Sequence, residues 1–167
     1  LAVDLKAAPF AGQQTHVIIP VPQLKDNEIY APNYTDGTRV ALVRYPHQGT
    51  FEIATCTVRN TGSPAEKIIP KAIDAVGINH NVADRLSGAD FDGDTVVVIP
   101  LSDKVKIRTH EPLELLKGFD PKEEYAGYEG MPVMSEHTKQ LEMGKISNLV
   151  TDMTVQAAPY EDIAYAT

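Results

Sequence analysis

The run Gly88-Ala89-Asp90-Phe91-Asp92-Gly93-Asp94 leads almost directly into the apolar segment Val96–Ile99, and these two stretches decide the fold and the chemistry expected of the chain. The three aspartates occupy alternate positions, so in an extended chain they lie on one side. Gly93 can take a positive φ and lets the backbone curl, which brings the carboxylates together. Converging carboxylates repel one another unless a cation lies between them, and Mg²⁺ characteristically binds a few carboxylates together with substrate phosphates. The predicted metal ligands are Asp90, Asp92 and Asp94.

Two other interpretations of this loop compete with a catalytic metal site. An EF-hand also begins Asp-x-Asp, but it needs Gly at position 6 and Glu at position 12. Counted from Asp90, position 4 is Gly93 and position 12 is Leu101, so the EF-hand is excluded. A plain hairpin turn around Asp92-Gly93 stays open, because Asp-Gly is a common turn dipeptide. Against it stands Phe91, an aromatic residue among three acids and close to an apolar strand.

The first part of the chain is rich in short segments of β-branched and aromatic residues that end at Pro, Gly, Asn or Asp. This pattern is typical of strands, and it predicts Thr15–Ile19, Arg39–Tyr45, Thr50–Val58, Lys67–Ile69 and Thr95–Ile99. Val96–Ile99 is apolar at every position, as in a strand buried on both faces. Lys71–Val76 and Asn81–Leu86 are predicted short helices. Many short strands with Pro and Gly at their corners favour a small barrel over a doubly wound sheet.

The last part of the chain has helical spacing instead. Glu111–Lys117 is predicted to form a turn or two of helix, and a longer helix is predicted from Ser135 or Glu136 to about Thr154. Ser135 is the expected N-cap, with Thr138 as the alternative. We therefore expect a barrel over residues 1–105 and, over 106–167, a helical and loop extension that packs on or beside it.

Composition limits the classes of function. The 167 residues are 43% hydrophobic, enough for one core, and no apolar run is long enough to span a bilayer. The start, Leu1–Asp4, lacks the pattern of a signal peptide. The single cysteine, Cys56, excludes an internal disulfide and predicts a buried thiol in a cytoplasmic protein. A net charge of −8 argues against a stand-alone nucleic-acid binder, because phosphate affinity comes mainly from Lys and Arg.

The aspartate run resembles the Asn-Ala-Asp-Phe-Asp-Gly-Asp signature of the largest subunit of cellular RNA polymerases. His80 lies ten residues before Asp90, as a histidine does in that family. Val96–Ile99 followed by Pro100-Leu101-Ser102 resembles the family's apolar strand that ends in Pro-Leu-Thr. Arg44-Tyr45-Pro46 resembles an Arg-x-Pro element. The flanks look more like the single-chain, two-barrel polymerases, which include phage-encoded and RNA-silencing enzymes, than like a bacterial subunit.

This resemblance implies a mainly β fold, a six-stranded double-psi β-barrel with a C-terminal helical segment. It implies that Asp90, Asp92 and Asp94 are catalytic residues that bind Mg²⁺, for which Mn²⁺ could substitute. It also implies nucleoside triphosphates and a nucleic-acid template and product as partners. It also implies a second barrel, in the same or another chain, that carries the basic residues this chain lacks. The candidate substrate contacts are Arg44, which in the family touches the ribose, His80, and Lys145 on the late helix, which could reach a phosphate. Gly88 departs from the family, whose asparagine at this position senses the sugar 2′-hydroxyl.

The leading functional hypothesis is therefore the metal-binding barrel of an RNA polymerase, templated by DNA or RNA, that transfers nucleotides with two Mg²⁺ ions. A metal-dependent nuclease or another phosphoryl-transfer domain could use the same loop. A non-catalytic barrel, in which the loop is a turn or binds a structural cation or a partner, is the alternative outside enzymes.

Overall fold

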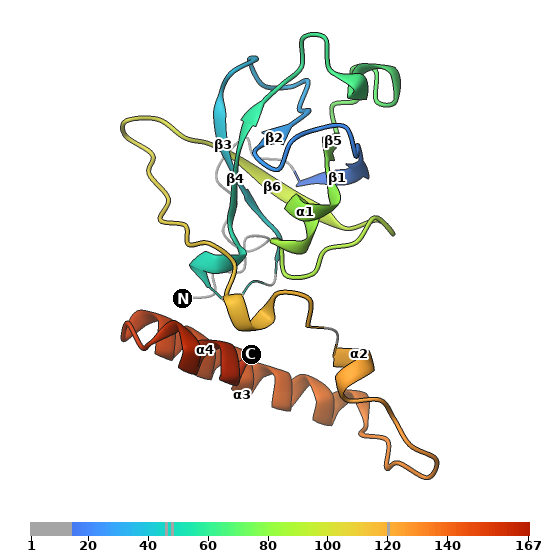
Figure 1. The fold of residues 1–167 in the computed structure, drawn as a ribbon, viewed down its shortest axis with the longest axis vertical. Coiled ribbons are helices and arrows are strands. Elements are labelled where there is room, and N and C mark those ends of the chain that lie inside the picture. The colour runs from blue at the N-terminus through green and yellow to red at the C-terminus, as the bar shows by residue number, and fades with distance from the viewer. Residues whose placement is uncertain (1–14, 46, 48, 120) are drawn as a thin grey trace. The chain divides into compact units, whose positions relative to one another are not determined.

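The structure, a computed structural model, describes residues 15–45, 47, 49–119 and 121–167 (Figure 1). The start of the chain, including Leu1–Asp4, and Pro46 of the Arg-x-Pro element lie outside the described residues. The chain divides into two compact units, one that ends at His110 and one that spans Glu111–Thr167.

The first unit is a six-stranded mixed sheet that nearly closes into a barrel (Figure 1). Its strands are β1 (Thr15–Pro20), β2 (Glu28–Ile29), β3 (Arg39–Val43), β4 (Ala54–Val58), β5 (Ala75–Ile78) and β6 (Thr95–Pro100). They are paired in the order β2-β4-β3-β6-β1-β5, in which β2–β4 and β1–β5 are parallel and the other pairs antiparallel.

The two edges of this sheet are joined by a single bridge. Tyr30 and Gly77 each donate their backbone N–H to the other's carbonyl, at 2.9 and 2.8 Å. Gly77 is required here because a Cβ at this position would stand 2.8 Å from Cγ2 of Val21 and 3.3 Å from Cβ of Tyr30. Because Gly77 has no side chain, β5 can approach the residue after β2 closely enough to form this bridge.

Alternating residues build the interior of the barrel. Successive side chains of a strand point to opposite faces, and one face of each long strand contributes to the main core. The inward residues include Val40 and Leu42 of β3, and Val96 and Val98 of β6. The other face of β3 and β6 is also buried, by a second cluster that contains Ala41, Val43, Ile53 and Ile99. Both strands are thus covered on two sides, as the apolar run Val96–Ile99 predicted.

Short helices occupy the connections between strands. The 3₁₀ helices η1 (Thr50–Glu52) and η2 (Pro64–Lys67) flank β4, and α1 (His80–Asp84) lies between β5 and the aspartate run. The side chain of Asn79 caps α1 by accepting the N–H of Val82 at 2.9 Å. Val82 and Ala83 of α1 pack into the barrel core, which fixes the point from which the aspartate run departs.

The second unit is helical. It contains η3 (Glu114–Leu116), α2 (Pro121–Glu124), α3 (Glu136–Val155) and α4 (Tyr160–Ala166), of which α3 and α4 lie side by side (Figure 1). Ser135 is the N-cap of α3, since its hydroxyl accepts the N–H of Thr138 at 3.1 Å, as predicted. Of the twenty residues of α3, Val150 is the one that is buried. None of the helices in the described residues is long and apolar enough to cross a lipid bilayer.

The predicted fold class is confirmed: a mainly β, six-stranded and nearly closed barrel with helical additions. Individual elements differ from the prediction. Lys67–Ile69 is not a strand, because Pro64–Lys67 forms a 3₁₀ turn capped by Ser63. Part of the predicted helix Lys71–Val76 is instead β5, which pairs in parallel with β1. Thr50–Glu52 is 3₁₀ rather than strand, and the two-residue strand β2 was missed.

Candidate metal centre

The aspartate run forms a tight loop between α1 and β6. Ser87 and Gly88 both have left-handed backbone angles, with φ of +59° and +62°, and Gly93 has a φ of +122°. These angles turn the chain sharply where it leaves α1 and again before β6. A side chain at Gly88 would meet no atom within 4 Å, and asparagine is among the residues that most readily take such a φ. An asparagine would therefore fit at Gly88.

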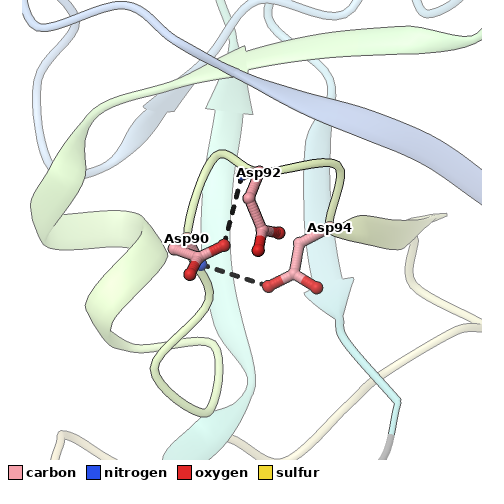
Figure 2. A group of neighbouring side chains, drawn as sticks. All are labelled: Asp90, Asp92 and Asp94. Carbon is pink, nitrogen blue, oxygen red and sulfur yellow. Dashed lines mark hydrogen bonds between the residues drawn. The ribbon is translucent and has the colours of Figure 1, made fainter.

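Backbone hydrogen bonds hold the loop in a curl that gathers its carboxylates (Figure 2). The N–H of Asp90 donates to Oδ2 of Asp94 at 3.1 Å, and the N–H of Asp92 donates to Oδ1 of Asp90 at 3.2 Å. One oxygen from each of the three carboxylates lies within 4.8 Å of the others. The convergence expected from alternate spacing and Gly93 is therefore present.

Phe91 anchors the loop to the barrel. Its ring is partly buried and packs against the main core, whereas Asp90 and Asp92 are exposed. The ring of His80 meets it edge-on, with centroids 4.9 Å apart and planes at 86°. His80 is thus brought to the loop through Phe91, a contact that spacing alone did not reveal.

Arg44 forms an ion pair with the third aspartate of the loop. Its Nε lies 3.0 Å from Oδ2 of Asp94, and its Nη2 donates to Oδ1 at 3.1 Å. Its Nη1 donates to the carbonyl oxygen of Ser87 at 3.3 Å. One guanidinium therefore ties both ends of the loop together. About a quarter of each side chain is exposed, 24% for Arg44 and 22% for Asp94.

The register of the barrel explains this pairing. Val40 and Leu42 point inward from β3, and Arg44 continues their row one step beyond the strand. Asp94 likewise continues the inward row of Val96 on β6. Since β3 and β6 are antiparallel neighbours, with Val43 opposite Val97, the two polar side chains emerge at the same end of the barrel.

Electrostatics within the loop disfavour its full ionisation. The pKa of Asp92 is raised above the ordinary value, first by its side-chain hydrogen bond with Asp90 and by the charge of Asp90, then by desolvation and by the charge of Asp94. The positive charge of Arg44 opposes this rise. Three crowded carboxylates with one guanidinium leave an excess of negative charge that a divalent cation would neutralise.

The donor set suits a hard divalent ion. All three groups offer carboxylate oxygens, the ligands that Mg²⁺, Mn²⁺ and Ca²⁺ prefer. In an octahedral Mg²⁺ site with bonds of about 2.1 Å, adjacent ligands stand about 3.0 Å apart, and at most one pair among three ligands can stand opposite, at about 4.2 Å. The three oxygens lie within 4.8 Å of one another, so the side chains would rotate toward a common ion in order to bind it together. The loop can therefore hold a metal ion, without selecting among these ions by its ligand type.

Lys145 belongs to a different part of the chain. It lies on α3 in the second unit, is largely exposed, and pairs with Glu142 one helical turn earlier at 2.8 Å.

The first unit brings together Asp90, Asp92, Asp94 and Arg44, with His80 beside them. Two participants were missed from the sequence, the carbonyl of Ser87 and the ring of Phe91 as an anchor. The signal available for the pairing of Arg44 with Asp94 was alternation. Arg44 stands two residues after the inward Leu42, and Asp94 stands two residues before the inward Val96.

No protein-family model matches the sequence, and no curated protein does. Among solved structures, the chain is similar to the RNA-dependent RNA polymerase QDE-1 from Thielavia terrestris, with 16% sequence identity and a TM-score of 0.43. The likeness covers 92% of this chain and 17% of that chain, so this chain spans about a sixth of that polymerase.

Proposed function

We propose that this chain is the metal-binding barrel of a nucleotidyltransferase of the RNA-polymerase type, with Asp90, Asp92 and Asp94 as its metal ligands and catalytic residues. The observation that carries the proposal is the convergence of these carboxylates within 4.8 Å, on a loop whose sequence resembles the polymerase signature. A solvent-exposed turn has no need of three converging charges anchored to a core by an aromatic residue.

The protein's contribution in this proposal is positioning. Bound divalent ions would supply an activated hydroxyl nucleophile and would neutralise the triphosphate and the leaving pyrophosphate. Asp90, Asp92 and Asp94 would fix where that positive charge stands, and the rigid strand β6 behind the loop would keep it there. Nucleotidyl transfer needs little covalent work from protein groups, since placement and charge stabilisation supply most of the rate.

Candidate substrate contacts lie on both units of the chain. Arg44 and His80 stand beside the loop and could reach a nucleotide bound there, and Lys145 is an exposed cation of the helical unit. The template and product need more positive charge than 15 basic residues against 23 acidic ones provide. We therefore propose a second barrel, in the same or another chain, that carries the basic surface.

The metal site is tested by titrating the 167-residue chain with Mn²⁺ and counting free ions by electron paramagnetic resonance. We expect weak binding by the wild type, and a loss of about tenfold or more for Asp90→Asn, Asp92→Asn or Asp94→Asn, because each removes a charged ligand. Asp103→Asn is the matched control, an exposed aspartate after β6, and should bind as the wild type does. Equal binding by all five proteins would mean that the loop is a turn.

The reaction class needs a second assay. The chain alone, given a primed template, nucleoside triphosphates and Mn²⁺, should incorporate little or nothing without its partner barrel. Robust incorporation by the chain alone, abolished by Asp92→Ala, would show that a partner barrel is not needed. Cleavage of labelled nucleic acid under the same conditions, abolished by Asp92→Ala, would instead identify a nuclease.

A further inference from the structure

The oxygens of Asp94 are already engaged by groups of the protein itself. Oδ1 accepts Nη2 of Arg44, and Oδ2 accepts both Nε of Arg44 and the N–H of Asp90. A carboxylate has about four lone-pair directions, so three of them at Asp94 are occupied. Asp90 and Asp92, in contrast, are exposed to solvent. The three carboxylates of the loop are therefore unequal before any ion arrives.

A divalent ion and the guanidinium would share one carboxylate at close range. An ion bound to Asp94 would stand only a few ångströms from Arg44, and like charges at that separation repel even in a medium close to water. The bidentate geometry also restricts the rotation that Asp94 needs in order to turn an oxygen toward the other two carboxylates. Arg44 therefore opposes the ion by charge and by geometry.

Asp94 does not depend on Arg44 alone for its position. Its carbonyl oxygen accepts the N–H of Ile18 on β1 at 3.0 Å, and its carboxylate keeps the hydrogen bond from Asp90. Without the guanidinium, the side chain would still be held at the end of β6 by these two bonds. Removing Arg44 should thus take away the competing charge more than the placement of the ligand.

We propose that Arg44 is a built-in counterion of the aspartate loop and competes with the divalent ion for Asp94. In the metal-free state it neutralises Asp94 and ties Ser87 to Asp94. Metal binding draws Asp94 away from the guanidinium, so Arg44 sets the metal concentration at which the loop fills and becomes free to contact another anion once it has filled. This inference rests on the proposed metal site, and within it Arg44 is a positioning residue.

The test compares Mn²⁺ affinity in the wild type, Arg44→Met and Arg44→Lys. Arg44→Met should bind Mn²⁺ roughly tenfold more tightly, because a unit positive charge a few ångströms away is removed. Arg44→Lys keeps the charge without the planar fork, so its affinity should stay within about threefold of the wild type. Arg39→Met is the matched control: it removes an exposed arginine at the other end of β3 and should leave the affinity unchanged.

A second measurement uses the wild-type chain and needs no substitution. The Nε–H resonance of Arg44 should shift on saturation with diamagnetic Mg²⁺ and exchange faster with solvent, since its acceptor has moved. An unchanged resonance at saturation would overturn the competition, and so would an Arg44→Met affinity equal to or weaker than that of the wild type. Failure of the wild type to bind Mn²⁺ at millimolar concentrations would instead overturn the metal site, and this inference with it.

Discussion

At the scale of single residues, the loop divides its carboxylates by environment. Asp94 is clasped by Arg44 and only 22% exposed, whereas Asp92 is exposed and its pKa is raised by Asp90. A carboxyl group whose pKa is raised by folding contributes stability below its ordinary pKa, and that contribution is lost as the pH rises through the raised value. The metal-free loop is therefore least favourable at neutral pH, the condition in which a cation would relieve it most.

Cys56 gives a pH-dependent prediction inside the barrel. Burial raises the pKa of its thiol from 9.0 to about 12, partly offset by the charge of Arg85. At pH 9 the native thiolate fraction is about one in a thousand, so alkylation by iodoacetamide should be at least about a hundredfold slower than in denaturant. Since Cys56 is the single cysteine of the chain, mass spectrometry reads this site alone.

The linked effect on stability has a definite sign. The unfolded thiol loses its proton near pH 9 and the folded thiol near pH 12, so the contribution of Cys56 is intact below pH 9 and is lost as the pH rises toward 12. Cys56→Ala should remove this part of the alkaline destabilisation. Rapid alkylation of the native protein at pH 9 would show that the thiol is accessible and ionised.

At the scale of elements, the barrel depends on the bridge between Tyr30, just after β2, and Gly77 of β5, which we call the seam. Gly77→Ala would place a Cβ 2.8 Å from Cγ2 of Val21, and overpacking of this kind costs about 1–3 kcal/mol. We expect a loss of this size in the free energy of unfolding by urea. Gly62→Ala, at a φ of +68° with no atom within 4 Å, should instead cost about 1 kcal/mol through backbone strain, which Gly77 does not have because its φ is not positive.

A double-mutant cycle isolates the steric cause. Val21→Ala removes the methyl group that the new Cβ would strike, so Gly77→Ala should cost less in the Val21→Ala background than in the wild type. Additive losses would mean that the seam tolerates a side chain and that the requirement for glycine lies elsewhere.

The seam also shows where sequence patterns failed. Lys71–Val76 has helix-like composition, yet Ala75 and Val76 belong to a strand because parallel pairing with β1 outweighs local propensity. The strand Glu28–Ile29 is too short to show an alternation of polar and apolar residues. In contrast, β6 and α3 were predictable, since an unbroken apolar run and an N-cap followed by helical spacing are strong local signals. Local patterns do not show which strands pair when these strands are far apart in the sequence.

The arrangement of the aspartates depends on more local signals than the strand pairing around it. The convergence of Asp90, Asp92 and Asp94 follows from spacing and one glycine, both local properties. The ion pair between Arg44 and Asp94 forms because β3 and β6 are paired strands, although the two residues are some fifty positions apart in sequence. The resemblance to the polymerase signature suggested Arg44 as a substrate contact. The register of β3 on β6 shows that Arg44 is paired with Asp94, a carboxylate of the loop itself.

At the scale of the whole molecule, charge sets the behaviour toward nucleic acid. With a net charge of −8, the chain should show no measurable affinity for single- or double-stranded nucleic acid in the presence of a chelator, because few phosphate counterions can be released. Fluorescence anisotropy at several salt concentrations measures this. Tight binding with chelator present, weakening steeply with salt, would reveal a basic surface that the composition does not suggest.

The order of strands in the barrel also governs when the loop can take shape. β1 is paired with β5 and β6, so its partners lie roughly sixty to eighty residues further along the chain. Such distant pairings close slowly, and the bond from Ile18 to Asp94 cannot form before them. During synthesis the aspartates would emerge before β6, so the bond from Ile18 and the ion pair with Arg44 could form only after β6 had docked. An ion bound by the finished loop would then act on the rate of unfolding rather than start the folding.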